Sequence, residues 1–384
     1  MSAPPSPFIL FRDDLAGRDT LFREPEKIIT AHDEAGFFAA LDEMEAARQA
    51  ARWLAGYFSY EAGYLLEKKL RPLLPEGRRG PLLVFGVFDA PSDAILPRQP
   101  EQPTNGPIFE ARAAWNFADY EPRFGRVHRH LREGDCYQVN LTFPVHAQWS
   151  GAPLSAFNAL TARQPVKYGA LVALGEPVVL SRSPELFFEV DTEGWIETRP
   201  MKGTAPRGAT KREDERLKRF LATDPKNQAE NRMIVDLLRN DISRISEVGT
   251  LSVPELFKVE AYPTVHQMVS TVRAKLLPGL GIADIFAALF PCGSITGAPK
   301  IRAMEVIRAL EAGPRGAYCG AIGWIAPDGP MRFNVAIRTI SLFGQGEAVY
   351  NVGGGVVFDS SAEEEYAECL LKARFATGAE PAST

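Results

Sequence analysis

Residues 331–358 read MRFNVAIRTISLFGQGEAVYNVGGGVVF, two runs rich in β-branched and aromatic residues on either side of a glycine-containing turn. We predict strands over Met331–Ile340 and Ala348–Phe358, because such residues favour the pleated backbone of a sheet. The turn Phe343–Glu347 is too short for the crossover that a parallel pair needs. The two strands should therefore form an antiparallel hairpin.

Other segments extend this pattern. Further strands are predicted at Trp53–Tyr60, Leu82–Phe88, Tyr137–Val145, Val178–Ser181 and, before the short turn Asp191–Trp195, Leu186–Val190. A helix is predicted where Phe37, Phe38, Leu41 and Met44 recur at helical spacing. No G-x-G-x-x-G follows a strand, and GSITGAPK at Gly293–Lys300 lacks the ending of a P-loop. The sequence therefore predicts an α+β protein with antiparallel sheets and disfavours a dinucleotide-binding fold.

The chain has 384 residues, which favours one large domain or two closely fused ones. Pro97–Pro107 (PRQPEQPTNGP) contains four prolines and almost no apolar side chain, so it is predicted to be an exposed connector. It would separate a short N-terminal part, residues 1–96, from a long remainder, residues 108–384.

Composition narrows the classes of function. A net charge of -5 argues against nucleic acid as the main ligand. The segment Met1–Asp14 lacks the pattern of a secretory signal, and no apolar run is long enough for a membrane helix, so a cytoplasmic location is expected. The cysteines form no C-x-x-C pair and are expected to be reduced, buried thiols: Cys136, Cys292, Cys319 and Cys369.

The segment Asp224–Ile245 is predicted to be a helix, with Asp224 as its cap and Pro225 in its first turn. Its buried stripe would be Met233, Ile234, Leu237 and Leu238. Glu230 lies one turn before this stripe, so its carboxylate should point inward, where a cation would compensate its charge. A solvated pair between Glu230 and Lys226 is the alternative.

The second strand of the opening hairpin carries three consecutive glycines, Gly353–Gly355, and leads into an acidic helix. Glycines inside a strand mark either a bulge or a place where a ligand or another backbone comes close. In the helix, Glu365 and Glu368 share a face with Lys372. The alternative to a ligand site is an ordinary surface pair between Glu368 and Lys372.

Two further segments, each taken alone, are only weak evidence for a functional site. The loop Gly293–Pro299 contains Thr296 and precedes a helix whose free N–H groups, with Lys300, could hold an anion. Lys202 stands in RPMKGT before Gly203, and most lysines at such positions face solvent.

Taken together, these segments resemble the chorismate-utilising enzymes, in that family's order from Gly134 to Ala373. The matching strings are GDCYQVNL, SRSPELFF, RPMKGT, AENRMIVDLLRND, VHQMVST, PCGSITGAPK, YCGAIGW, VAIRT and GGGVVFDS. The resemblance implies two antiparallel sheets packed as a sandwich and surrounded by helices, with the active site in a central cleft.

The resemblance also implies a magnesium enzyme, with Glu230 and Glu368 as Mg²⁺ ligands and Glu365 beside them. Asn227 stands where relatives commonly carry an acidic residue. Chorismate is a dianion, so the cation would anchor one carboxylate and protein donors the other. The predicted substrate-binding set is Arg338, Tyr318, Gly353, Gly354, Gly355, Thr296, Lys300 and Gln138.

Two positions separate reactions within this family. Gln138 stands where water-adding members carry a lysine base, and Lys202 stands where anthranilate-forming members carry an alanine. Lys202 therefore implies the branch that makes 4-amino-4-deoxychorismate, by attack of the lysine at C2 and of ammonia at C4. Glu185 would act as general acid and then as base, with His266 near the leaving hydroxyl.

The ammonia source is not evident, since no G-x-C-x-G elbow of a glutaminase occurs. The resemblance implies a separate glutamine amidotransferase subunit. Two alternatives are component I of an anthranilate synthase, which Lys202 argues against, and a catalytically silent chorismate-binding subunit. The joint presence of Glu185, Lys202, Glu230 and Glu368 argues against the silent subunit.

Overall fold

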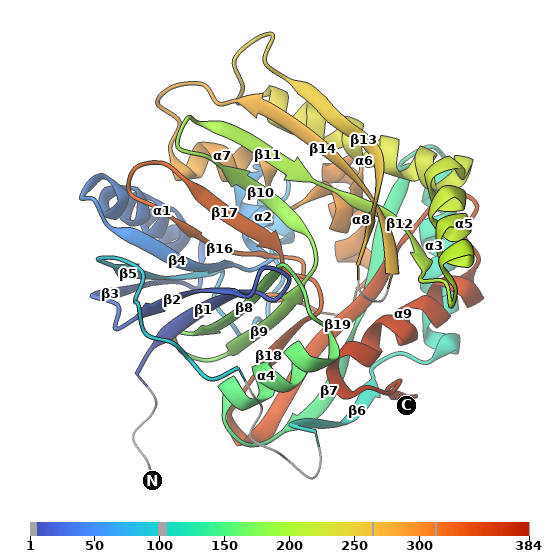
Figure 1. Ribbon diagram of the computed structural model, residues 1–384, viewed down its shortest axis with the longest axis horizontal. Coiled ribbons are helices and arrows are strands. Elements are labelled where there is room, and N and C mark those ends of the chain that lie inside the picture. Colours follow the sequence, from blue (N-terminus) through green and yellow to red (C-terminus); the bar gives the residue numbers. More distant parts are fainter. Residues whose placement is uncertain (1–5, 99–105, 263–264, 312, 384) are drawn as a thin grey trace.

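The structure, a computed structural model, describes residues 6–98, 106–262, 265–311 and 313–383. Its strands form two sheets, sheet A and sheet B, whose elements are labelled in Figure 1. In order across the sheet, sheet A contains β2 (Arg18–Arg23), β1 (Phe8–Asp13), β8 (Tyr168–Ala173), β9 (Val178–Ser183), β18 (Thr339–Leu342), β19 (Glu347–Val356), β7 (Gln138–Trp149), β6 (Ile108–Ala113) and β20 (Ala382–Ser383), with β15 (Gly297–Ala298) also paired to β7.

Sheet B has the same number of strands among the described residues. Its order is β12 (Met201–Pro206), β14 (Val265–Lys275), β11 (Trp195–Arg199), β10 (Leu186–Val190), β17 (Met331–Val335), β16 (Ala321–Ile325), β4 (Trp53–Phe58), β5 (Leu83–Phe88) and β3 (Lys27–Ala31), with β13 (Ser252–Ala261) also paired to β14. The strand pairs are antiparallel, except that β20 runs parallel to β6. Side chains from both sheets, among them Ile9, Val172, Tyr57 and Ile322, share one apolar cluster, so the sheets pack face to face.

Helices cover the outer faces of this sandwich. They are α1 (Glu34–Gln49), α2 (Ala62–Leu66), α3 (Phe117–Arg132), α4 (Pro153–Arg163), α5 (Lys211–Thr223), α6 (Pro225–Ser243), α7 (Ile282–Leu289), α8 (Lys300–Leu310) and α9 (Ala362–Thr377), with 3-10 turns at Arg71–Leu73, Gly293–Ile295 and Gly344–Gly346. Helices α4, α8 and α9 contact sheet A, whereas α1, α5 and α6 contact sheet B. The expected α+β fold, two antiparallel sheets surrounded by helices, is confirmed, and no helix of the described residues is long and apolar enough to cross a membrane.

The expected hairpins are present. Strand β10 pairs with β11, and β18 pairs with β19, both antiparallel. The predicted cap of α6 is also confirmed, because the Asp224 carboxylate accepts the backbone N–H of Asn227 at 2.9 Å. On this helix Ile234 and Leu238 are buried, while Met233 and Leu237 are half-buried.

The single strand predicted over Met331–Ile340 is wrong. The segment is two strands, β17 in sheet B and β18 in sheet A, and the chain passes between the sheets at residues 336–338. Arg338 takes a φ of 50° there, a backbone conformation that is uncommon for residues other than glycine. The apolar character of the run continues through the crossing, which is why periodicity alone did not reveal it.

A second crossing lies beside the first. Strand β9 belongs to sheet A and β10 to sheet B, and the chain passes between them at Pro184 and Glu185. The two crossings are joined by backbone hydrogen bonds from Val335 to Glu185 (3.1 Å) and from Arg182 to Arg338 (2.9 Å). Glu185 and Arg338 are therefore held side by side between the sheets.

The C-terminal hairpins occupy the middle of both sheets. The pair β16–β17 lies between β10 and β4 in sheet B, and β18–β19 lies between β9 and β7 in sheet A. Strands from residues 1–96 also contribute to both sheets, β1 and β2 to sheet A and β3 to β5 to sheet B. The division of the chain at residues 97–107 stays a prediction, and residues 99–105 lie outside the described ranges.

A buried ion network joins the N-terminal part to the rest. The Glu61 carboxylate accepts the backbone N–H groups of Arg315 (2.6 Å) and Gly316 (3.0 Å). The Arg315 guanidinium binds both oxygens of Glu311 and donates to the carbonyl oxygens of Ile295 and Asn140. Removing one partner of a buried ion pair typically lowers the free energy of unfolding by about 3–5 kcal/mol. This network therefore holds the segment around Arg315 and Gly316 firmly in place.

Candidate active site

Lys202 is the centre of the site. It lies on β12 at the edge of sheet B, and its side chain reaches across to sheet A. A Cβ placed on Gly355 of β19 would lie 3.0 Å from the Lys202 Nζ and 2.9 Å from the Gln138 Cδ. Glycine at position 355 therefore leaves the room that the lysine and the glutamine need. The bulge alternative for the glycine run is wrong, because β19 keeps a regular register with β7 throughout.

Gln138 presents an unpaired amide to this space. Its side chain is fully buried, and neither its amide nitrogen nor its amide oxygen has a hydrogen-bond partner. An unmade hydrogen bond in a protein interior costs about 1–3 kcal/mol, so a group left in this state indicates a ligand position.

Glu185 lies at the second crossing and is buried. Burial raises the pKa of its carboxyl group to about 7, although the Ser294 hydroxyl, Lys202 and the Met201 backbone amide all favour the ionised form. The Ser294 Oγ donates to the Glu185 Oε1 at 2.8 Å. A carboxyl group that titrates near neutrality can both give and take a proton.

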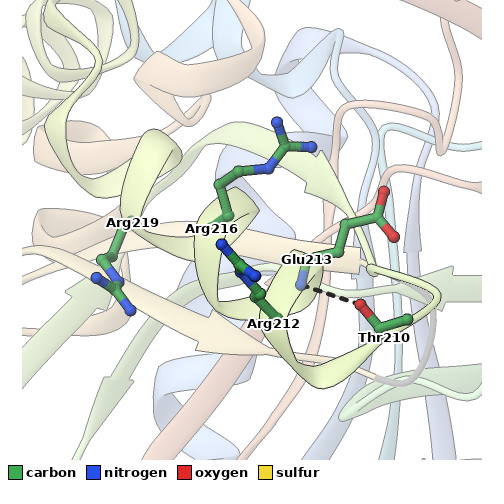
Figure 2. A pocket seen from close by; sticks show the side chains of 5 residues that line it. All are labelled: Thr210, Arg212, Glu213, Arg216 and Arg219. Carbon is green, nitrogen blue, oxygen red and sulfur yellow. Dashed lines mark hydrogen bonds between the residues drawn. The ribbon is translucent and has the colours of Figure 1, made fainter.

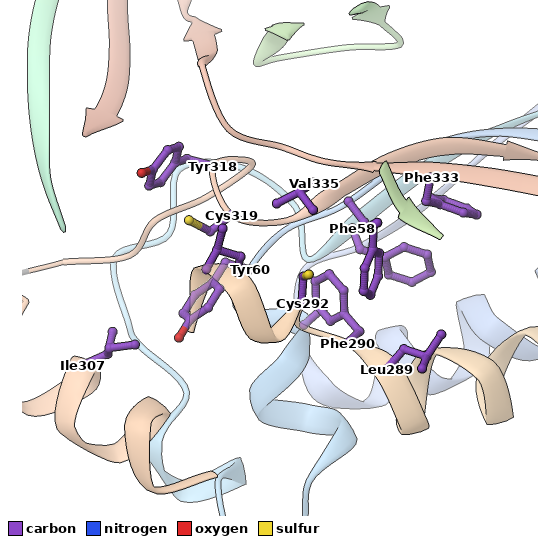
Figure 3. Close-up of a cluster of buried hydrophobic side chains, with 14 of the residues drawn as sticks. Phe58, Tyr60, Leu289, Phe290, Cys292, Ile307, Tyr318, Cys319, Phe333 and Val335 are labelled. Carbon is purple, nitrogen blue, oxygen red and sulfur yellow. The ribbon is translucent and has the colours of Figure 1, made fainter. Parts of the chain in front are cut away.

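Arg338 lies at the first crossing. Burial lowers the pKa of its guanidinium to about 10, with the Glu185 charge opposing the shift. With the Gln164 amide turned so that its oxygen faces Arg338, this oxygen accepts a hydrogen bond from the Arg338 Nε at 3.1 Å. Among the described residues Arg338 has no ion pair with a carboxylate, so it is a buried cation suited to an anionic ligand. Tyr318 is buried beside Cys319 at the edge of the apolar cluster drawn in Figure 3.

The charges of three further carboxylates interact with that of the lysine amine. Glu230 is half-buried on α6, and Glu365 and Glu368 lie on α9, which follows the glycine strand. A Cβ on Gly354 would meet the Glu365 Oε2 at 2.7 Å, so this carboxylate touches the glycine run. The expected pair of Glu368 with Lys372 is present at 2.8 Å, and Lys372 also donates to the Gly353 carbonyl oxygen at 3.0 Å.

The electrostatics of this group favour a neutral lysine. Burial lowers the pKa of Lys202, and the Lys372 ammonium acts in the same direction, while Glu230, Glu185 and Glu365 oppose the shift. Burial raises the pKa of Glu365. Loss of hydration would raise the pKa of Glu368 too, but Lys372, Lys202 and Lys226 hold it below its usual value.

The three carboxylates offer the oxygen ligands that a hard cation prefers. The alternative pair between Glu230 and Lys226 is absent from the described part of the chain. Within that part, the ligand atoms of His130, Glu133 and Asp135 lie within 4.8 Å of one another, and those of the three glutamates do not. The magnesium roles stay predictions.

Other predicted residues have partners outside this centre. The His266 Nε2 lies 2.9 Å from the Asp214 Oδ1 on α5, and its Nδ1 has no partner. The Thr296 hydroxyl donates to the Cys292 carbonyl oxygen at 3.0 Å. Lys300 forms an ion pair of 2.7 Å with the buried Asp241. These contacts hold α5 and the loop before α8 in place, and the predicted roles of the three residues stay predictions.

Helix α5 also borders a surface hollow of about 480 Å³, shown in Figure 2. The hollow contains no predicted site residue, and its lining is Thr210, Arg212, Glu213, Arg216 and Arg219.

Several contributors to the site were not predicted. Ser294 and Gln164 contact Glu185 and Arg338, and Gln267 and Asn231 contact the backbone that carries Lys202. Ser294 lies in the loop Gly293–Pro299, for which the sequence predicted a possible anion site. Gln164 gave no local signal, because its role depends on a contact with a distant segment.

The comparisons with known proteins define the class. Residues 6–378 match the family model described as chorismate binding enzyme, and the chain belongs to that family. Aminodeoxychorismate synthase component 1 of Klebsiella aerogenes is 41% identical over 304 residues, which cover 78% of this chain and 67% of that protein. Aminodeoxychorismate synthase component 1 of Escherichia coli (strain K12) is 45% identical over 253 residues, 66% of this chain and 55% of that protein.

The matched segments thus span about two thirds or less of these relatives' own lengths. Among solved structures, anthranilate synthase component I from Streptococcus pneumoniae TIGR4 superposes with a TM-score of 0.80 and 27% identity, covering 98% of this chain and 93% of that chain.

Proposed function

We propose that this protein is component I of an aminodeoxychorismate synthase, which converts chorismate and ammonia to 4-amino-4-deoxychorismate on the route to 4-aminobenzoate and folate. The proposal rests on the position of the Lys202 amine. This amine lies against Gly355 and Gln138 between the sheets, and its charge interacts with that of the Glu185 carboxylate. The names of the relatives support the same activity.

In the proposed mechanism, neutral Lys202 attacks C2 of chorismate and the C4 hydroxyl departs. Protonated Glu185 gives its proton to that hydroxyl, which leaves as water. Ammonia then adds at C4 and expels the lysine amine from C2, and ionised Glu185 accepts the proton that ammonia gives up. The raised pKa of Glu185 and the lowered pKa of Lys202 both favour the protonation states with which this sequence begins.

The substrate carboxylates need separate partners. Arg338 would hold one of them, because its buried guanidinium forms no ion pair with a carboxylate in the part of the chain that the structure describes. Among the strands of the described residues, β19 beyond Tyr350 pairs with β7 on one side only, so N–H groups on the other edge of Gly353–Gly355 would be available to a ligand. Glu230, Glu368 and Glu365 would hold Mg²⁺, which when bound would neutralise the second carboxylate and orient the ring.

We expect the activity to require a divalent cation. Excess chelator should abolish turnover, and added Mg²⁺ should restore it, because the substrate and the three glutamates otherwise repel one another. Glu230→Ala and Glu368→Ala should each lose nearly all activity at saturating chorismate while unfolding like the wild type. Glu364→Ala, which removes an exposed carboxylate of α9, is the matched control and should keep full activity. Undiminished turnover in chelator would contradict the magnesium site.

We further expect the purified chain to use ammonium but not glutamine until an amidotransferase subunit is added. Chorismate, Mg²⁺ and ammonium should yield a product that retains the enolpyruvyl group, identified by its mass. Anthranilate as the main product would favour the alternative, an anthranilate synthase component I. Glutamine-dependent product from the chain alone would refute the need for a partner. The proposal includes a cytoplasmic location, with which the four buried free cysteines agree.

A further inference from the structure

The strand that carries Lys202 contains a bulge at the lysine itself. Met201 pairs with Val269 and Thr204 pairs with Gln267, so three steps along β12 match two steps along β14. Lys202 and Gly203 together oppose one residue of the neighbouring strand. Gly203 takes a φ of 94°, and a Cβ there would meet the Asn227 Oδ1 at 2.8 Å. Bulges of this kind redirect a side chain and leave backbone groups outside the regular ladder.

The displaced carbonyl groups have side-chain partners. The Gln267 Nε2 donates to the Gly203 carbonyl oxygen at 2.9 Å. The Asn231 Nδ2 makes a longer contact, 3.5 Å, with the Lys202 carbonyl oxygen. Two consecutive carbonyl groups of the bulge are thus held by two amides, one from β14 and one from α6.

Each amide is itself fixed by a hydroxyl group. The Thr204 Oγ1 donates to the Gln267 Oε1 at 2.9 Å, and the Ser270 Oγ donates to the Asn231 Oδ1 at 2.6 Å. With its oxygen occupied, each amide must turn its NH₂ group toward the bulge. Asn231 and Ser270 are completely buried, so their pair has no competition from water.

We propose that Gln267 and Asn231 are positioning residues that hold the Lys202–Gly203 bulge and thereby direct the lysine amine at the substrate. Without them the edge strand β12 would be free to slip by one residue toward regular pairing with β14, which would turn Lys202 away from Gly355. The inference rests on the proposed role of Lys202 as nucleophile.

Gln267→Met tests the inference, because methionine keeps the length of the side chain and removes both hydrogen bonds. We expect the Lys202 adduct with chorismate, formed without ammonia, to appear about 10–100-fold more slowly, since a misplacement of about 1 Å can cost a factor of this size. The value of kcat should fall in parallel while KM for chorismate stays close to that of the wild type. The pH midpoint of adduct formation should also shift, because the lysine moves relative to Glu230 and Lys372.

Thr204→Val, which removes only the hydroxyl that orients the Gln267 amide, should give a smaller loss of the same kind and covers the case in which Gln267→Met fails to fold. Gln228→Met is the matched control: Gln228 also donates its amide to a carbonyl group, that of Ala222 at 2.7 Å, and its loss should leave adduct formation unchanged. Adduct formation at the wild-type rate in both Gln267→Met and Thr204→Val would overturn the positioning role while leaving the proposed function intact. Absence of any adduct in the wild type would instead overturn the nucleophile itself.

Discussion

Lys202→Ala should abolish covalent attachment of chorismate to the protein and reduce amination at C4 by about 10³-fold or more, as removal of a nucleophile does elsewhere. The lysine amine is the group that reaches from β12 to Gly355, whereas the amine of Lys372, which also lies at the glycine strand, is paired with Glu368 and with the Gly353 carbonyl oxygen. With the lysine gone, the space beside Gly355 opens a route for ammonia to C2, so a small yield of anthranilate is expected.

The measurement is mass spectrometry of the peptide containing Lys202 after incubation with chorismate and Mg²⁺ but no ammonium. Lys211→Ala, which alters an exposed lysine at the start of α5, should form the adduct normally. Amination of C4 at an undiminished rate in Lys202→Ala would exclude the lysine as nucleophile and leave the proposed mechanism without its central step.

Glu185→Gln should lower kcat by about 10²–10⁴-fold, the usual contribution of a general acid or base. Glutamine keeps the shape of the side chain and can still accept from Ser294, so the fold should persist. Since the hydroxyl departs only with a proton from Glu185, activity in the wild type should fall as pH rises through about 7, the pKa to which burial raises this group.

This loss of activity at higher pH should disappear in Glu185→Gln. The rise in activity with pH that reflects deprotonation of Lys202 should remain. Glu189→Gln on the following strand β10, where the carboxylate pairs with Arg332 at the surface, is the control and should retain the wild-type profile. If the pH profile of Glu185→Gln is unchanged, the loss of activity at higher pH must come from the titration of another group.

The sequence predicted those parts of the fold that depend on short-range geometry. The turns at residues 191–195 and 343–347 allow only antiparallel hairpins, and both hairpins formed. The passage between the sheets at residues 336–338 was missed, because neither hydrophobic alternation nor a glycine marks it. Arg338 adopts a positive φ that the surrounding structure imposes.

The same distinction applies to the site. Helical spacing was enough to predict the side of α6 on which Glu230 lies, because that side depends only on its own helix. The approach of Lys202 to Gly355 joins the two sheets, and only the complete fold brings these residues together. The neighbours His266 and Gln267 illustrate the limit, since successive side chains of a strand point to opposite faces. His266 points to α5 and Gln267 to the Lys202 bulge, and the sequence alone did not distinguish these directions.

The central position of the two C-terminal hairpins has a consequence for how the chain acquires its structure. A nascent chain that ends before Ala321 has neither β16–β17 nor β18–β19, so β10, β4, β9 and β7 each present an unpaired edge. Such edges join readily to those of other molecules, and pairings between segments so distant in sequence form slowly. Both sheets therefore depend on the same late segment, residues 321–356, and we expect its addition to close the gap in the middle of each sheet and to bring Gly355 against Lys202.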